Sequence, residues 1–277
     1  MSSATEGASA GESVRVPALQ LTNISKAFGA VQALRDVDFE VYSGEVVGLV
    51  GDNGAGKSTL VKTIAGVNVP DTGEIFVNGQ RAHISGPSDA TRLGIETVYQ
   101  DLALCDNLDV VNNLYLGREA VSAPAGPLSP LNELEMERRT VEVLRTLDVK
   151  IPSVRSMVQS LSGGQRQSIA VAKTILRNAR VVLLDEPTAA LGVAQTRQVL
   201  SLIKRLREQG LAVVVISHNL ADVFEVVDRV VVMRLGRRIA TFDIHNTTPE
   251  KVVAAITGAE FSEVAENGDA SDVATPA

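Results

Sequence analysis

The stretch EVVGLVGDNGAGKST, residues 45–59, decides the fold of this chain. It begins with a continuous apolar run, which indicates a strand covered on both faces, as in the middle of a parallel sheet. The run leads into a loop that fits the pattern G-x-x-x-x-G-K-[ST], and a helical segment follows Lys57. Glycines allow successive backbone N–H groups to converge on phosphate oxygens, and the start of a helix adds partial positive charge. The stretch therefore predicts a strand, a phosphate-binding loop and a helix, in that order.

Two side chains of this loop have the chemistry that a bound nucleotide requires. Lys57 can reach the β- and γ-phosphates, and the hydroxyl of Ser58 can bind Mg²⁺. A glycine-rich turn with a surface lysine is the simpler interpretation, but the strand–loop–helix setting favours the phosphate loop. We expect the nucleotide contacts to come from Gly51, Asp52, Asn53, Gly54, Ala55, Gly56, Lys57, Ser58 and Thr59.

A second stretch, LLDEPTAALG at 183–192, runs from apolar residues straight into two acids. We expect its strand to neighbour the phosphate loop, so that Asp185 lies where a nucleotide-bound Mg²⁺ would sit. Glu186 points elsewhere and can polarise a water for attack on the γ-phosphate. The alternative is a pair of solvated acids that open a turn, helped by Pro187. A phosphate loop in the same chain weakens that alternative.

LSGGQRQ, residues 161–167, predicts a second anion-binding helix start. Ser162 as N-cap and Gln165 three residues later form a capping box, which is a sufficient structural explanation of both residues. Two glycines in a first turn nevertheless cost about 1 kcal/mol each relative to alanine, which suggests that something approaches the backbone closely. Ser162, Gly163 and Gly164 would then form half of an anion site that another molecule completes.

Composition limits what else the chain can be. Its 277 residues are 45% hydrophobic, enough for one large core with a satellite subdomain. The net charge of −7 excludes a global basic field for nucleic acid or anionic lipid. The single cysteine, Cys105, excludes an internal disulfide and fits a reducing compartment. The N-terminal residues show no secretion signal, and the aliphatic runs are too short to span a bilayer.

Strands alternate with helices along the rest of the chain. DVDFEV at 36–41 alternates as a half-buried strand does, and Asn78-Gly79 is a hairpin signal. Further strands are predicted at 94–100, 180–186 and 211–218, with a hairpin at 229–242 that turns near Gly236. Helical spacing is present at 169–176 and 199–206, and a last helix runs from an N-cap at Thr248 to Gly258. This alternation predicts an α/β fold with a parallel sheet.

Three segments differ from this pattern. Residues 104–160 contain helical patterns, a Pro/Gly/Ser-rich break at 122–130 and no convincing strand, so we expect a helical subdomain inserted into a domain at 15–258. Residues 1–14 are rich in Ser, Ala and Gly, and residues 259–277 form an acidic tail. Both ends are expected to be disordered, because such segments bury too little apolar surface to order themselves.

With these motifs in place, the sequence resembles the ATP-binding subunits of ABC transporters over about residues 17–258. The motifs are GDNGAGKST (Walker A), VYQ ending at Gln100, LSGGQRQ (the signature), VVLLDEP (Walker B) and VISH ending at His218. Their order and spacing are specific to the family. The resemblance implies a P-loop NTPase core of RecA type with an antiparallel β subdomain and an inserted helical subdomain. It also places Phe28 where an aromatic ring stacks on adenine.

The family pattern implies a role for each matching position. Two copies of the chain would enclose two ATP molecules head to tail, each between Walker A of one chain and the signature of the other. ATP and Mg²⁺ are the implied cofactors, with Ser58, Gln100 and Asp185 at the metal. Glu186 would be the general base, and His218 would hold the γ-phosphate. The implied catalytic residues are Glu186, His218, Gln100 and Lys57, and the signature contacts are Ser162, Gly163, Gly164 and Gln165.

Within the family the sequence is most similar to the ATPases of ribose, xylose and fructose importers, through YQDLALCDNLDVVNNLYLGRE and EPTAALGVAQT. Those proteins commonly carry two cassettes, so one cassette implies a homodimer. The resemblance further implies transmembrane permease subunits, an indirectly associated substrate-binding protein and a peripheral position on the cytoplasmic face of the inner membrane. Gly192 is a departure, because many family members have Asp there.

Two other functions are compatible with the same motifs. A soluble ABC-type ATPase acting on DNA or the ribosome is one, although such proteins usually carry coiled-coil, zinc or tandem-cassette insertions and no nucleic-acid partner is expected here. An ATP-gated binding module that barely hydrolyses ATP is the other, and Glu186 and His218 argue against it. The leading hypothesis is an Mg²⁺-ATPase that drives uptake of a monosaccharide.

Overall fold

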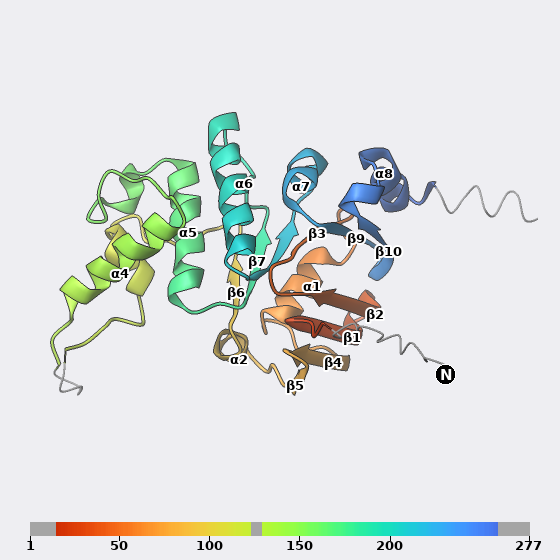
Figure 1. Cartoon of the computed structure of the whole chain (residues 1–277). Coiled ribbons are helices and arrows are strands. Elements are labelled where there is room, and N and C mark those ends of the chain that lie inside the picture. Colours follow the sequence, from red (N-terminus) through yellow and green to blue (C-terminus); the bar gives the residue numbers. More distant parts are fainter. Residues whose placement is uncertain (1–14, 123–128, 260–277) are drawn as a thin grey trace, which may run out of the picture.

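The computed structural model describes residues 15–122 and 129–259. A six-stranded sheet forms the centre of the molecule, with strand order β10-β9-β3-β8-β7-β6 (Figure 1). All neighbouring strands in it are parallel except β9 and β10, which pair antiparallel as a hairpin. The strands are β3 (Val46–Val50), β6 (Ile95–Val98), β7 (Val181–Asp185), β8 (Ala212–Ile216), β9 (Arg229–Arg234) and β10 (Arg237–Asp243).

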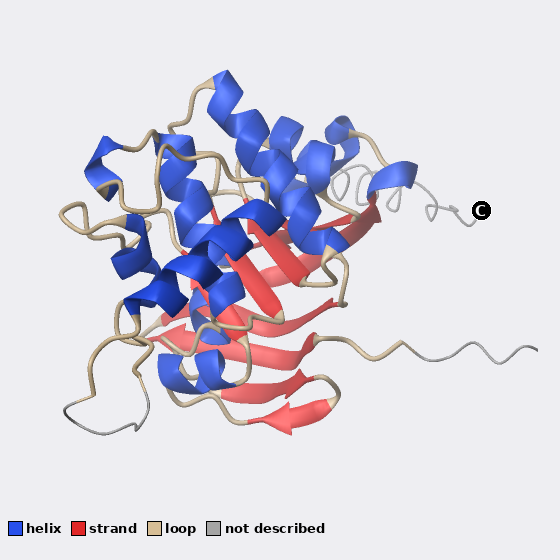
Figure 2. Ribbon diagram, turned by 60° about the vertical axis from the view of Figure 1, so that its left-hand side comes forward, coloured by secondary structure: helices blue, strands red, loops and turns tan. Residues whose placement is uncertain are grey.

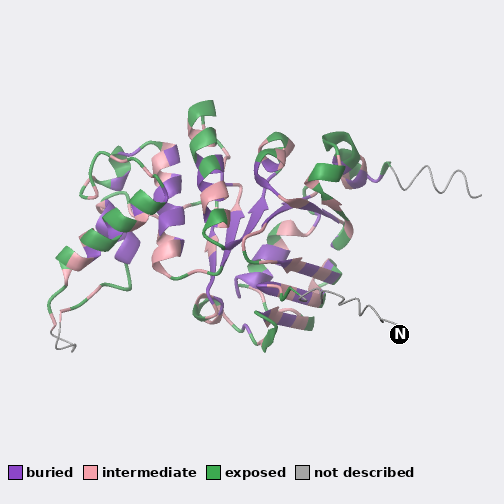
Figure 3. Cartoon of the chain, in the orientation of Figure 1, coloured by how far each residue is buried: buried purple, intermediate pink, exposed green. Residues whose placement is uncertain are grey.

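Alternate residues of the central strands enter two separate cores, which is the two-residue period of a sheet covered on both faces. In β7, Leu184 packs in a first core and Leu183 in a second, and both are fully buried. The central strands are accordingly among the most buried parts of the chain (Figure 3). The run at 45–51 thus forms a central strand, as predicted.

One face of this sheet is covered by helices (Figure 2). The helices of the first core are α5 (Gly163–Leu176), α6 (Val193–Glu208), α7 (Leu220–Val226) and α8 (Pro249–Thr257). Helix α8 begins after Thr248 and ends at Gly258, as expected, although the Thr248 side chain makes no capping hydrogen bond. No helix in the described ranges is long and apolar enough to cross a membrane.

The other face is covered by helix α1 (Lys57–Ile64) and an antiparallel sheet of order β2-β1-β4-β5, while the short helix α2 (Pro87–Arg92) leads into β6. The predicted strand DVDFEV lies in β2, where Val37, Phe39 and Val41 are buried. The predicted hairpin at Asn78-Gly79 joins β4 to β5, and both turn residues have positive φ. The strands of this sheet are β1 (Leu19–Phe28), β2 (Val31–Val41), β4 (Thr72–Val77) and β5 (Gln80–Ala82).

The segment at 104–160 contains α3 (Val110–Tyr115), α4 (Glu133–Thr146) and the short 3₁₀ helix η1 (Val158–Ser160). In its described part the β pairing is limited to two isolated bridges. Met136 and Leu144 of α4 join the first core, so this helical region packs beside α5. The bounds proposed for the helical subdomain stay a prediction. The expected disordered segments lie outside the described residues, apart from Ala259.

The order of the strands in the sheet is a detail that the sequence does not predict. In the structure β8 lies between β3, which leads into the phosphate loop, and β7, which ends at Asp185. Sequence periodicity identifies buried strands and carries no information on their order in the sheet. Because β3, β8 and β7 are parallel, their carboxyl ends still meet at one edge.

Candidate nucleotide-binding site

The phosphate loop connects β3 to α1 in a conformation that requires glycine at two positions. Gly51 has a φ of 150°, and a Cβ placed there would lie 2.2 Å from the carbonyl oxygen of Met233. Gly56 has a φ of 102°, and its Cβ would lie 2.8 Å from the carbonyl oxygen of Ala33. The loop is therefore held against β9 and β2 by contacts that a side chain would break.

Lys57 is folded back across this loop. Its Nζ donates to the carbonyl oxygens of Gly51 at 2.7 Å and Asp52 at 3.0 Å. Burial lowers the pKa of Lys57, while the carboxylates of Glu186, Asp52 and Asp185 act in the opposite direction. A partly desolvated ammonium of this kind gains from any further negative charge, so a phosphate at the loop would be bound favourably.

Asp185 is the last residue of β7 and pairs with Ile216, the last residue of β8. Burial raises the pKa of Asp185, Glu186 raises it further, and Lys57 and Lys62 lower it. Nearby cations therefore only partly balance the negative charge of this carboxylate. Together with the Ser58 hydroxyl it offers the oxygen donors that Mg²⁺ prefers. Among the described residues no group of three or more His, Cys, Asp or Glu could hold a metal ion by itself.

Glu186 and His218 lie together at the same edge. The Nδ1 atom of His218 lies 2.9 Å from the Oε1 atom of Glu186. Glu186 has a positive φ of 51°, which is uncommon for a residue with a side chain. Its backbone N–H donates to the carbonyl oxygen of Ile216 at 2.8 Å, so the strained residue is tied to the end of β8. Only 18% of the Glu186 side chain is exposed, against 76% for His218.

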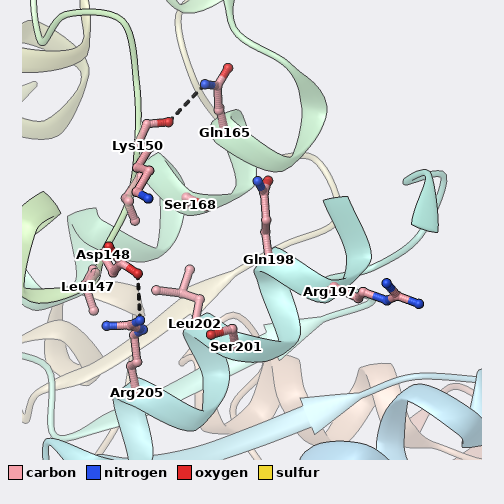
Figure 4. Close-up of a pocket in the computed structure, with 11 residues that line it drawn as sticks. Leu147, Asp148, Lys150, Gln165, Ser168, Arg197, Gln198, Ser201, Leu202 and Arg205 are labelled. Carbon is pink, nitrogen blue, oxygen red and sulfur yellow. Dashed lines mark hydrogen bonds and ion pairs between the residues drawn. The ribbon is translucent and has the colours of Figure 1, made fainter. Parts of the chain in front are cut away.

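The signature segment begins α5 with the capping box that the sequence predicts. The Ser162 hydroxyl accepts from the Gln165 N–H at 3.3 Å, and the Gln165 Oε1 accepts from the Ser162 N–H at 3.0 Å. The Gln165 Nε2 donates to the Lys150 carbonyl oxygen at 3.0 Å, so this side chain lies against the 147–150 loop (Figure 4). Gln165 is therefore held by local contacts, and its side chain is half-buried.

Each of the two signature glycines has a close neighbour in the same chain. A Cβ at Gly163 would lie 3.0 Å from the Leu191 side chain, and one at Gly164 would lie 3.0 Å from the Cβ of Gln195. The close neighbour that these glycines admit is the segment of the same chain that leads into and begins α6. Gln195 is a residue that the sequence interpretation missed. Its Oε1 also accepts from the Gly192 N–H at 3.3 Å.

The remaining expected residues lie at the rim. Gln100 is exposed and follows β6 by two residues, so it stands at the same sheet edge as Asp185. Phe28 ends β1 with 49% of its surface exposed, and the Lys26 Nζ lies 5.6 Å from the centre of its ring. Ala55 is the buried residue of the phosphate loop. A contact between Ala55 and a ligand would therefore involve its backbone and not its side chain.

These residues form two groups. The phosphate loop, Asp185, Glu186 and His218 share the carboxyl edge of the central sheet. The signature begins α5 in the helical layer, whereas α1 belongs to the opposite layer. A phosphate loop of this pattern on a parallel sheet, with acids at the strand ends, defines a nucleotide-binding domain of the P-loop class.

Comparison with known proteins narrows the class further. The family model described as ABC transporter matches residues 34–189. The xylose/arabinose import ATP-binding protein of Sulfolobus acidocaldarius is 41% identical, over 89% of this chain and 96% of its own length. The fructose import ATP-binding protein of Rhizobium meliloti is 43% identical, over 88% and 95%. This chain belongs to the ABC transporter family and contains its ATP-binding domain.

A longer relative and two solved structures agree with this assignment. The ribose import ATP-binding protein of Yersinia pestis is 38% identical over 90% of this chain, which spans 48% of that relative. The ADP conformation of an ATP-binding cassette from an ABC transporter has a TM-score of 0.74 at 25% identity, over 91% of this chain and 99% of its own. A dimeric post-hydrolysis cassette bound to ADP and Pi has a TM-score of 0.67 at 25% identity, over 83% and 100%. The predicted fold class is confirmed.

Proposed function

We propose that this chain is the ATP-hydrolysing subunit of an ABC importer for a monosaccharide. The observation that carries the proposal is identity of 41% and 43% along nearly the whole length of two proteins named for import of xylose/arabinose and of fructose. The charged groups at the carboxyl edge of the sheet support it, because they suit hydrolysis of a bound nucleotide. The names of these relatives favour import over a DNA- or ribosome-associated ATPase.

The site would work as a dimer. Lys57 would exchange its two carbonyl acceptors for phosphate oxygens, so binding would neutralise its partly buried charge. Phe28 is exposed enough to stack on the adenine. Ser162, Gly163 and Gly164 of a second copy would cover the nucleotide, since the signature and the phosphate loop begin helices in different layers. The dimeric post-hydrolysis cassette supports this arrangement.

Glu186 would accept a proton from the attacking water. Its carboxylate is mostly buried and its backbone is fixed by the Ile216 carbonyl, so the base would be held in place. His218 contacts that carboxylate and would orient it and the γ-phosphate. Ser58, Gln100 and Asp185 would hold Mg²⁺, which neutralises phosphate charge when bound. Gln100 would also connect this edge to the membrane partner.

The implied partners are a second copy, transmembrane permease subunits and, indirectly, a substrate-binding protein, with the chain peripheral on the cytoplasmic face of the inner membrane. Affinity capture of the full chain from membranes tests the transporter assignment. Recovery of a polytopic permease, together with ATPase activity that depends on it, is the expected result. Recovery of ribosomes or DNA-bound complexes in its place would reject import.

A further inference from the structure

A cavity of about 640 Å³ gathers five arginines on a chain whose net charge is −7. It is formed by the β4–β5 hairpin, α2, the residues after α3 and the segment between α5 and β7. Helix α2 and strand β5 lie beside each other near the bottom of Figure 1. None of the described residues that line the cavity is an Asp or Glu. The arginines are Arg81, Arg92, Arg118, Arg177 and Arg180.

Three of these arginines are held by carboxylates of the same chain. Arg81 pairs with Glu74 at 2.8 Å, Arg92 pairs with Asp89, and Arg177 pairs at 3.1 Å with the buried Glu96. The Arg177–Glu96 pair is largely buried, whereas the side chains of Arg81 and Arg92 are 72% and 76% exposed. Arg177 also keeps a buried Nε–H with no partner within 15–122 and 129–259, and the Glu96 Oε1 atom is likewise unpartnered there.

The other two arginines are uncompensated. Arg118 and Arg180 are exposed, and within the part of the chain that the structure describes their side chains make no hydrogen bond or ion pair. Guanidinium groups are always protonated, so these two like charges face one cavity without a counter-ion from the protein. An anion placed between them would be stabilised by both.

The remaining walls indicate a small ligand. Asn78, Gln80, Thr91 and Asn178 supply neutral donors, and few apolar side chains line the cavity. A cavity of this volume is within the range of small-molecule sites, and planar guanidinium groups match phosphate oxygens in pairs.

We propose that this cavity binds a phosphate-bearing polyanion, either a free phosphorylated compound or the headgroup of a phospholipid. The site is separate from the nucleotide site. Gly94 and Arg180 precede β6 and β7, so the cavity lies at the amino edge of the sheet, whereas Asp185 ends β7 at the carboxyl edge. The ligand would therefore not compete with ATP, and this proposal does not depend on ATP hydrolysis or on import.

Calorimetric titration of the full chain with fructose 1,6-bisphosphate tests the proposal. We expect saturable binding that weakens about tenfold or more in an Arg118→Gln, Arg180→Gln double variant, because two charged donors are lost. Lys57→Ala should retain this binding while losing ATP, which separates the cavity from the phosphate loop. Arg238→Gln, which removes an exposed arginine on β10 that does not line the cavity, is the matched control and should bind normally.

A second arm separates the two sources. Binding to phosphatidylcholine vesicles that contain phosphatidylglycerol, lost in the double variant and absent without the anionic lipid, assigns a headgroup. Binding of the bisphosphate alone assigns a free compound. The proposal is overturned if the double variant binds the bisphosphate and the vesicles as tightly as wild type does. It is also overturned if wild type binds neither probe. The proposal is also overturned if polyglutamate displaces the bisphosphate when it supplies a lower concentration of negative charge than the bisphosphate does. The cavity would then be a protein-docking site.

Discussion

The Nδ1 atom of His218 lies 2.9 Å from the Oε1 atom of Glu186, and the two residues come from the ends of neighbouring parallel strands. Their separation in the chain is large, but β7 and β8 pair in register up to Asp185 and Ile216. The contact therefore follows from the sheet, which carries each residue to the same edge. It gives the proposed base a fixed partner on the solvent side.

Glu186→Gln should abolish turnover while leaving ATP binding intact. Glutamine keeps the shape of the side chain but cannot accept the proton, and general-base catalysis is commonly worth about 100-fold to 10,000-fold. The variant should also accumulate as an ATP-bound dimer. Turnover, nucleotide affinity and mass by light scattering are the measurements. Near-normal turnover in Glu186→Gln would remove the assignment of the base.

Asp185→Asn should stabilise the nucleotide-free protein. The pKa of Asp185 is raised in the folded state, chiefly by burial, so the folded state binds this proton more tightly than the unfolded state. Stability is then lost as the pH rises from the ordinary pKa through the raised one, and the full penalty remains at pH 7. Removing the charge should raise the melting temperature at pH 7 by roughly 2 °C. The melting temperature of the variant should also change less with pH in the acidic range.

The matched control for Asp185→Asn is Glu208→Gln, which removes an exposed charge at the end of α6. That change should leave the pH dependence unaltered. Mg²⁺-ATP should raise the melting temperature of wild type and not that of Asp185→Asn. A lower melting temperature for Asp185→Asn without nucleotide would contradict the account of this carboxylate.

Gly192→Asp should stabilise α6. Gly192 occupies its N-cap with a φ of −75° and open space around the position of a Cβ, so any side chain fits. Asp caps helices better than Gly by a few tenths of a kcal/mol, whereas Ala is worse by up to about 1 kcal/mol. Chemical denaturation of Gly192→Asp, wild type and Gly192→Ala should give that order of stability. The reverse order would show that this end of α6 is not limited by its cap.

ATPase rate per chain should rise with protein concentration in the dilute range. The signature and the phosphate loop begin helices in opposite layers, so one copy would supply only half of each site. Mixing inactive Lys57→Ala with wild type should depress the rate of the remaining wild-type chains. A rate independent of concentration, from a chain shown to be monomeric, would exclude the two-chain site.

Much of the fold is predictable because its signals are local. The alternation in DVDFEV, the hairpin at Asn78-Gly79 and the apolar run before Gly51 each depend on neighbouring residues, and each forms the expected element. Strand order depends on contacts distant in sequence, so the position of β8 between β3 and β7 was not predictable.

The site was predictable to a similar extent. Motif patterns predict which residues share the carboxyl edge, since parallel strands end there. They carry no signal for side-chain partners such as His218 with Glu186. They also could not show that Gln195 and Leu191 lie against the signature glycines, because that contact depends on how α5 and α6 pack.

Sugar uptake by the reconstituted complex tests the central claim most directly. The captured permease and this chain would be placed in proteoliposomes and supplied with ATP and a panel of labelled monosaccharides, with and without a substrate-binding protein. We predict uptake of at least one sugar that requires ATP and is lost with Glu186→Gln. ATP hydrolysis without uptake of any sugar, or equal uptake by Glu186→Gln, would contradict the account.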